Sequence, residues 1–467
     1  MISFFPKQIA TKAIYLYLGS LSVVTLVFFR FAMSIDFIIM GIAWVVGFFL
    51  LSSQCSTRWR DIPPKTLMRY LFLTALGLRV FWVFFAYIYF TLKTGLPFEF
   101  SAADSLWYYE ESVGNIHTHW ADIWNYLFVD TASVSDSGYI FYLTALTKIF
   151  GENIVFPRLV NATLSAAAVV LVYNLAKRNI GEEGGRLAAI FTCFMPNFIF
   201  YCGLHMKETV MIFLIVAFLE RADCLLRSKN NIVLNIIAVV LLVLVLFTFR
   251  TVLGIVAVFS IATALVFSRT DVVGKAKRYM LIGWGILAVA TFAGGIISSE
   301  ISGLIENSDT NQDNKRLMQT NKGNQWAKYA TGTVMAPMMF VLPFPTMVDV
   351  DQQYNQQMLS GGNFVRNFLG GFVLIALFST LFVTKNWRNL SLIGSFVIAY
   401  LGIISTSGFA NSERFLLPAL PILLIMAAYG VTLLNAKNYR FVKIWYYVVP
   451  VMAVAWAFFK LGSRGLF

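Results

Sequence analysis

The chain has 467 residues, of which 58% are hydrophobic and only 13% are charged. Soluble domains carry about a quarter of their residues charged, so this composition excludes an ordinary soluble globule. The formal net charge of +13 does not indicate a nucleic-acid partner, because Lys and Arg are concentrated in short connectors between apolar runs, as the orientation of a membrane protein by positive charge requires.

Apolar runs long enough to cross a bilayer recur along most of the chain. They predict an all-α polytopic membrane protein with about thirteen transmembrane helices. The first run lacks a small-residue cleavage site, so it is predicted to be an anchor rather than a signal peptide. The predicted spans are 12–32, 34–52, 70–92, 157–176, 187–204, 209–226, 231–249, 252–268, 279–298, 367–384, 389–406, 415–434 and 442–461.

The connectors between these spans predict an orientation. Placing every positive connector in the cytoplasm requires alternating spans, and the predicted spans alternate without a break. The N-terminus is then cytoplasmic, and 93–137, 299–333 and 350–366 face outward. The positive connectors are 57–69, 177–186, 220–229, 268–278, 385–388 and 436–440.

This alternation requires that two further segments do not cross. The segment 138–150 is too short to span, and 334–349 is interrupted by prolines, so both are predicted to be interfacial or re-entrant. The chain is accordingly divided into a hairpin with its connector, a core with outer loop 93–150, an outer loop with a re-entrant or interfacial segment, and C-terminal helices. These parts are 1–69, 70–298, 299–366 and 367–467.

The first outer loop is acidic and aromatic. No Lys or Arg occurs between Thr94 and Thr147. Aromatic side chains with acids beside a membrane surface predict short amphipathic helices parallel to the bilayer, or else an interfacial belt with a solvated acidic rim. The carboxylates are Glu99, Asp104, Glu110, Glu111, Asp122, Asp130 and Asp136, and the aromatic residues include Trp107, Tyr108, Tyr109, Trp120, Trp124 and Tyr126.

Two separated stretches resemble the GT-C superfamily of polyprenyl-phosphate-sugar-dependent glycosyltransferases, which includes protein O-mannosyltransferases and lipid A aminoarabinose transferases. The first, within roughly 70–225, contains an outer-loop acid at Asp104, an aromatic run ending in Phe150-Gly151, Arg158-Leu159, and a basic pair followed by Gly181. The second is "NSERFLLPALPILLIMAAYGVTLL" (411–434), similar to the span that closes the same fold. The resemblance implies a GT-C-like fold.

The sequence departs from that pattern at two positions. Relatives often carry Asp-Glu where this chain has Asp104-Ser105, and Lys-Pro-Pro where it has Ser135-Asp136-Ser137. Since that lysine helps to hold the donor phosphate in relatives, another cation is expected to take this role here.

The resemblance implies an active site at the outer boundary of the membrane. Transfer of a sugar from a lipid phosphate needs a carboxylate to accept a proton and cations to hold the leaving phosphate. Asp104 and Glu208 are the candidate catalytic residues. The alternatives are that Asp104 only caps a helix and that Lys207-Glu208 is an interfacial anchor.

The candidate substrate-binding residues are mostly cations at outer span ends. Arginine suits phosphate because its planar fork makes paired bonds, although arginines at span ends also snorkel to the surface. Arg79 lies inside a span and is expected to have a partner in the bundle interior. The substrate-binding candidates are Arg158, Lys207, Arg250, Arg414 and Tyr108.

No cofactor and no metal site is assigned. The His117-x-His119 pair beside Glu110 and Glu111 leaves a divalent ion as an open alternative. The four cysteines show no metal-ligand or paired spacing.

The resulting hypothesis is a glycosyltransferase in the bacterial inner membrane, with its site facing the periplasm. Its expected partners are a polyprenyl phosphate-linked sugar, a glycan, lipid or protein acceptor, and membrane lipids. A close alternative is a polysaccharide polymerase or ligase with a diphosphate-linked donor, which would want more cations than the loop offers. A lipid flippase or transporter is the alternative from another class. Transporters usually contain two related halves, and the absence of an internal repeat in this sequence argues against that class.

Overall fold

The computed structural model describes residues 3–130, 134–227, 231–267, 344–351, 353–384, 386–406 and 413–462. Within these residues every regular element is a helix, which confirms the all-α prediction. The predicted span 279–298, the connector 268–278 and the loop 299–333 lie outside the described residues.

Eight helices among the described residues are long and apolar enough to cross a membrane. The length and composition of these helices therefore support a multi-pass membrane protein. Two shorter apolar helices are α11 (Thr251–Phe267) and α17 (Ser391–Thr406). The eight lie in α1 (Lys7–Val27), α2 (Ile35–Arg58), α3 (Pro64–Thr94), α7 (Val155–Phe194), α10 (Ile232–Phe249), α16 (Ser360–Phe378), α18 with α19 (Glu413–Leu416 and Leu420–Thr432) and α20 (Ala436–Gly462).

Some helix ends differ from the predicted span boundaries, and a proline or a glycine marks several of them. The helix α3 begins at Pro64, where a missing N–H costs nothing, and ends before Gly95, whose φ of +80° suits a helix C-terminus. The helix α1 begins at Lys7, directly after Pro6, five residues before the predicted start.

The segment α7 is a hairpin of two helices. Gly181 has φ +86° and ψ 170°, which breaks the helix. Arg79 bonds both Ser165 and Thr192, which a straight helix would hold roughly 40 Å apart at about 1.5 Å per residue. The two halves therefore fold back on each other, and the turn predicted in 177–186 is confirmed.

The second half of that hairpin is interrupted, whereas the sequence predicts an unbroken span over 187–204. A short helix α8 (Pro196–Cys202) follows the break at Met195. Pro196 has no N–H, so the carbonyl of Thr192 lacks its helical donor. Arg79 donates to this carbonyl at 3.3 Å and to that of Cys193 at 3.2 Å. The buried guanidinium thus satisfies a helix end inside the bundle, which answers the expectation that it has an interior partner.

Polar contacts join the predicted positive connectors at one end of the bundle, here named the connector end. Arg186 donates to the carbonyls of Trp59 and Ile62 at 2.9 and 2.8 Å. Arg227, at the end of α9 (Glu208–Arg227), donates to the carbonyl of Asn389 at 2.8 Å. Arg178 pairs with Glu220 and Asp223 of the same helix. Three of the six predicted connectors, 57–69, 177–186 and 220–229, therefore share one end with Asn389, which directly follows the connector 385–388.

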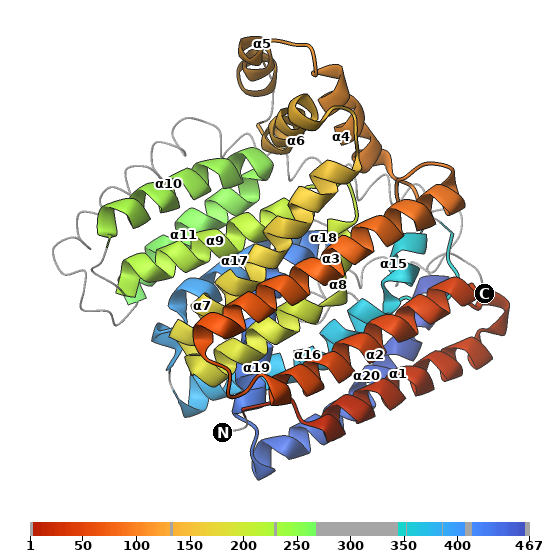
Figure 1. Ribbon diagram of the computed structural model, residues 1–467. Helices are drawn as coiled ribbons and strands as arrows, with labels where there is room; N and C mark the ends of the chain where they lie inside the picture. The colour runs from red at the N-terminus through yellow and green to blue at the C-terminus, as the bar shows by residue number, and fades with distance from the viewer. Residues whose placement is uncertain are drawn as a thin grey trace.

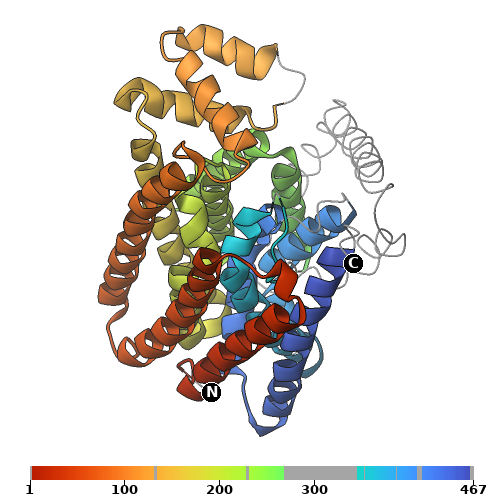
Figure 2. The same cartoon turned by 90° about the vertical axis from the view of Figure 1, so that its right-hand side faces the viewer.

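The segment 93–150, predicted to be the first outer loop and called by that name below, folds into three helices at the opposite end, here named the loop end (Figure 1, Figure 2). They are α4 (Ala103–Gly114), α5 (Trp120–Trp124), continued by a π-helical turn over Asn125–Val129, and α6 (Ser137–Phe150). At about 1.5 Å per residue α6 is roughly 21 Å long, less than the hydrocarbon thickness of about 30 Å. The predicted helices of this loop are confirmed, and α6 is too short to cross.

Candidate functional site

Three helix starts bring two carboxylates and an arginine together at the loop end. Asp104 lies in the first turn of α4, Glu208 opens α9, and Arg414 lies in the first turn of α18. Arg414 forms an ion pair with Asp104 through Nη1, and its Nε lies 3.4 Å from Oε1 of Glu208. The Glu208 side chain is 1% exposed and that of Asp104 is 44% exposed. One carboxylate therefore anchors the guanidinium from inside, and the other reaches it from the solvent side.

A second arginine lies on the same aromatic ring as the first. The guanidinium groups of Arg250 and Arg414 lie 4.4 and 5.2 Å from the ring centre of Phe415. Arg250 occupies the turn between α10 and α11, and its Nη1 is 3.5 Å from the hydroxyl of Tyr400. This turn and ring place Arg250 beside the site, where it adds positive charge.

Lys207, in the loop before α9, completes a set of three cations. It forms an ion pair with Asp136, which lies just before α6. Burial, and then the repulsion of Arg250, lower the pKa of Lys207 to about 7, while the pairing with Asp136 favours its charged form. The loop thus contributes an acid, and the cation comes from Lys207.

Tyr108 faces this cluster from α4 and is buried. Its ring packs edge-on against Tyr139 of α6 at 4.9 Å. Burial, followed by the charges of Glu208 and Asp104, raises the pKa of Tyr108, so the phenol keeps its proton. It is therefore available as a hydrogen-bond donor beside two carboxylates.

A cavity of about 260 Å³ opens beside Asp104 and Arg414. Its wall combines the first outer loop, the α8 region, and the segment around α15 (Tyr354–Met358). The lining residues are Glu99, Phe100, Ser101, Ala103, Asp104, Phe200, Tyr201, Leu204, Met206, Gln353, Asn355, Gln356, Glu413 and Arg414.

Glu413 is a cavity residue that the sequence analysis did not single out. It is 3% exposed, and its two oxygens accept from Asn197 at 2.5 Å and Asn363 at 3.1 Å. The only sequence feature that could have identified Glu413 as a site residue is its position directly before Arg414. An acid beside an arginine at a span end, however, is also typical of an interfacial ion pair. The amide groups that donate to Glu413 come from distant segments, and no sequence pattern predicts these contacts.

Arg158 lies apart from this cavity lining. It is fully buried at the start of α7, and Nη2 donates to the carbonyl of Pro97 at 2.6 Å. Its guanidinium lies 5.8 Å from the ring of Phe98. Burial raises the pKa of Glu99, and the positive charge of Arg158 opposes this rise. Within the described part of the chain, Nε and Nη1 of Arg158 have no hydrogen-bond partner. Arg158 therefore contacts the loop segment 97–99, of which Glu99 lines the cavity.

His205 lies in the same buried layer. Its ring is 6.4 Å from that of Phe98 and 6.0 Å from that of Tyr109. Burial, and then the charge of Arg158, lower its pKa to about 3, so the imidazole is neutral at physiological pH. Neither ring nitrogen has a partner among the described residues.

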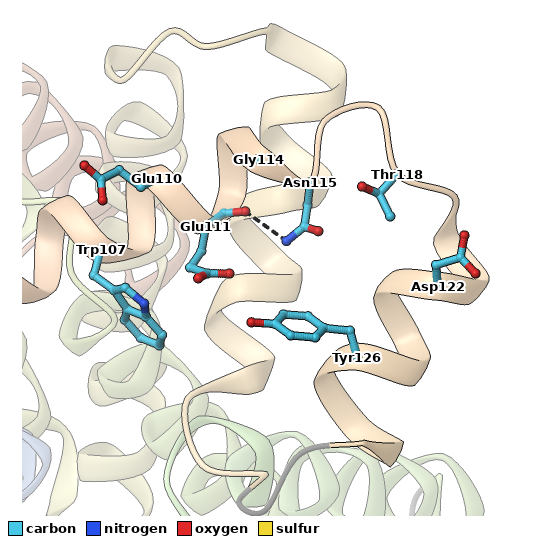
Figure 3. A pocket seen from close by; sticks show the side chains of 8 residues that line it. All are labelled: Trp107, Glu110, Glu111, Gly114, Asn115, Thr118, Asp122 and Tyr126. Atoms are coloured by element: carbon cyan, nitrogen blue, oxygen red, sulfur yellow. Dashed lines mark hydrogen bonds between the residues drawn. The ribbon is translucent and has the colours of Figure 1, made fainter.

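A second hollow, of about 420 Å³, lies between α4 and α5 (Figure 3). Figure 3 shows Glu110, Glu111 and Asp122 around it with Trp107 and Tyr126. The residues that line it do not include His117 or His119. Across the described ranges, no group of three or more His, Cys, Asp or Glu side chains is arranged to hold a metal ion.

Comparison with known proteins adds nothing to this geometry. No protein-family model matches the sequence, and no curated protein matches it.

Proposed function

We propose that this protein is an integral-membrane glycosyltransferase. It would move a hexosyl or pentosyl group from a polyprenyl phosphate carrier to a cell-envelope glycan, lipid or protein on the outer side of the bacterial inner membrane. The proposal includes a GT-C-like arrangement of about thirteen spans, of which the helices described above are a part. The observation that carries it is the position of Arg414 between Asp104 and Glu208 at a cavity on the loop end.

The orientation follows from charge. Three positive connectors and the residue after a fourth lie together at the connector end, and positive connectors remain in the cytoplasm. The N-terminal segment lies at the same end, since the Phe5 N–H donates to Ser56 and its carbonyl accepts from Ser53. The cavity, at the opposite end, then opens toward the periplasm.

Each member of the cluster has a chemical role in the proposed transfer. Asp104 takes the proton of an acceptor hydroxyl as the acceptor oxygen attacks the anomeric carbon. The bond from that carbon to the phosphate oxygen breaks, and its electron pair leaves with the phosphate. Arg414 neutralises the charge on the leaving phosphate, and Lys207 and Arg250 strengthen the positive potential there. Because attack and departure occur on opposite faces of the sugar, the configuration at that carbon inverts.

The ion pair of Arg414 and Asp104 also gives an order to these events. A phosphate that binds Arg414 competes with the Asp104 carboxylate for the same guanidinium. Glu208, buried and in contact with Nε, keeps Arg414 in place during the exchange. Donor binding thereby frees Asp104 to act as the base.

A reconstitution experiment tests the function. Purified protein in proteoliposomes receives radiolabelled polyprenyl phosphate-linked hexoses, and a cell-envelope fraction supplies the acceptor. We expect the labelled sugar to be transferred from the carrier lipid to an acceptor molecule, with release of polyprenyl phosphate. Label that crosses the bilayer while still joined to its carrier would instead identify a flippase.

A further inference from the structure

The segment around α15 lines the proposed site but matches no part of the sequence-based site. Gln353, Asn355 and Gln356 face the same cavity as Asp104 and Arg414. The segment is fixed to the first outer loop, since Nδ2 of Asn355 donates to the carbonyl of Phe100 at 2.7 Å. These amides are therefore part of the cavity wall.

A lysine from the last turn of the C-terminal helix fixes two of these amides. Lys460 is 7% exposed, and Nζ donates to Oε1 of Gln353 at 2.8 Å and to Oε1 of Gln356 at 3.2 Å. An ammonium group only donates, so both carboxamide oxygens must face Lys460. The two Nε2 groups then point away from Lys460, each with two N–H donors.

Asn355 has the opposite polarity. Its Nδ2 is occupied by Phe100, and its Oδ1 has no hydrogen-bond partner in the described part of the chain. The segment therefore offers amide donors from two residues and an acceptor from the residue between them. Such alternation matches hydroxyl groups, which both donate and accept.

The cavity also limits the size and charge of what it holds. Its volume of about 260 Å³ is just below the roughly 300–1,000 Å³ typical of sites for drug-sized ligands. Three carboxyl groups line it, Glu99, Asp104 and Glu413, and among the described residues Arg414 is the single cation in the lining. A second negative group on the ligand would meet repulsion with no further cation in the lining to offset it.

We propose that Gln353 and Gln356, oriented by Lys460, bind the hydroxyl groups of the donor sugar, and that this sugar is a monosaccharide without an acidic group. The inference rests on the proposed function and names the substrate class of the same site. Gln353 and Gln356 are specificity residues that touch the sugar, and Lys460 is a positioning residue.

The test uses a substitution that removes the donors and keeps the contact with Lys460. Gln353→Glu and Gln356→Glu retain an oxygen for the ammonium group but replace both N–H donors with an acceptor. Gln8→Glu, exposed at the connector end, is the matched control for the added charge. The probes are decaprenyl phosphate alone, and decaprenyl phosphate carrying glucose, mannose, galactose or glucuronic acid, titrated into protein in nanodiscs.

We expect the wild type to bind at least one neutral sugar-phosphate lipid more tightly than decaprenyl phosphate alone, and the glucuronic acid lipid no more tightly. Each Gln→Glu variant should weaken binding of that neutral lipid by roughly five- to tenfold, as loss of a ligand hydrogen bond predicts. Binding of the sugar-free lipid and thermal stability should stay near wild type. Lys460→Met should reduce the preference for the sugar, and Lys460→Arg should largely preserve it.

Two failures are distinguishable. If the wild type binds decaprenyl phosphate but gains nothing from any neutral sugar, or if the Gln→Glu variants keep the gain, the sugar-binding role of Gln353 and Gln356 is wrong and the proposed function stands. If no lipid phosphate binds at all, the proposed function fails and takes this inference with it. Tighter binding of the glucuronic acid lipid would overturn the assignment of a sugar without an acidic group.

Discussion

Arg414 and Asp104 form an ion pair between the start of α18 and the first turn of the outer-loop helix α4. These residues lie far apart in the sequence, and the fold brings them into contact. The pair is half-open, since the Asp104 side chain is 44% exposed and that of Arg414 is 26% exposed. The substrates of the proposed reaction therefore have access to it.

The first prediction concerns the proposed base. Asp104→Asn keeps the size of the side chain and removes its charge, so transfer should fall by about 10²–10⁴-fold. Because an exposed ion pair contributes at most about 1 kcal/mol, the unfolding free energy should change little. Rates of label transfer and thermal unfolding measure the two effects. Glu110→Gln, exposed on the same helix, is the control, and equal loss in both variants would point to damage to α4 rather than loss of a base.

The second prediction separates two arginines that the sequence analysis treats alike. Arg414→Lys keeps a charge but loses the planar fork, so donor affinity should fall by roughly tenfold or more while the fold survives. Arg158→Lys should instead lower thermal stability, because Arg158 is fully buried and holds the carbonyl of Pro97. Lipid-phosphate titration beside thermal unfolding gives both readings. A stable Arg158→Lys variant with weakened donor binding would identify Arg158 as a phosphate ligand, as the sequence analysis predicts.

The sequence predicts part of the fold and part of the candidate site. Hydropathy predicts most of the helices, since the physics of burying backbone in lipid allows few alternatives. Asp104, Glu208 and Arg414 stand out because charges beside apolar runs are costly and conspicuous. The roles of Gln353 and Gln356 could not be predicted, because an amide costs little in a loop and its meaning depends on Lys460, which is distant in sequence. Likewise, apolarity alone predicts one span over 187–204, although Pro196 supplies the signal for its break.

The third prediction tests the orientation. Ala121→Cys in α5 and Asp61→Cys in the first connector both place a thiol at an exposed position, one at each end of the bundle. In a background with Cys55 and Cys224 replaced by Ser, the two remaining native cysteines are buried. A membrane-impermeant maleimide added to spheroplasts should label Ala121→Cys, and should label Asp61→Cys only after permeabilisation. The reverse pattern would move the site to the cytoplasm and exclude an outer-leaflet reaction.

The fourth prediction concerns acid. The pKa of His205 is lowered from 6.5 to about 3 by burial and by Arg158, so below pH 6.5 the unfolded chain binds a proton that the folded chain does not. Keeping His205 neutral therefore costs the folded protein no stability above pH 6.5, and it destabilises the fold increasingly as the pH falls toward 3. His205→Phe, which keeps a ring against Phe98 and Tyr109, should make the apparent melting temperature fall less steeply over this range. Parallel curves for the two proteins would mean that His205 is not held neutral in the fold.

The fifth prediction concerns the hairpin turn that brings both halves of α7 against Arg79. Gly181 has φ +86° and ψ 170°, a conformation that residues with a Cβ adopt only with strain, so Gly181→Ala should destabilise by about 1–3 kcal/mol. Gly77→Ala is the matched control, since its added methyl meets nothing within 4 Å inside the helix α3, and alanine in place of a helical glycine is neutral or stabilising by up to about 1 kcal/mol. Thermal unfolding in one detergent compares the two variants. The expected result is a lower transition for Gly181→Ala alone. Equal transitions would show that the turn adjusts without strain, and the positive φ at Gly181 would then not be what requires glycine there.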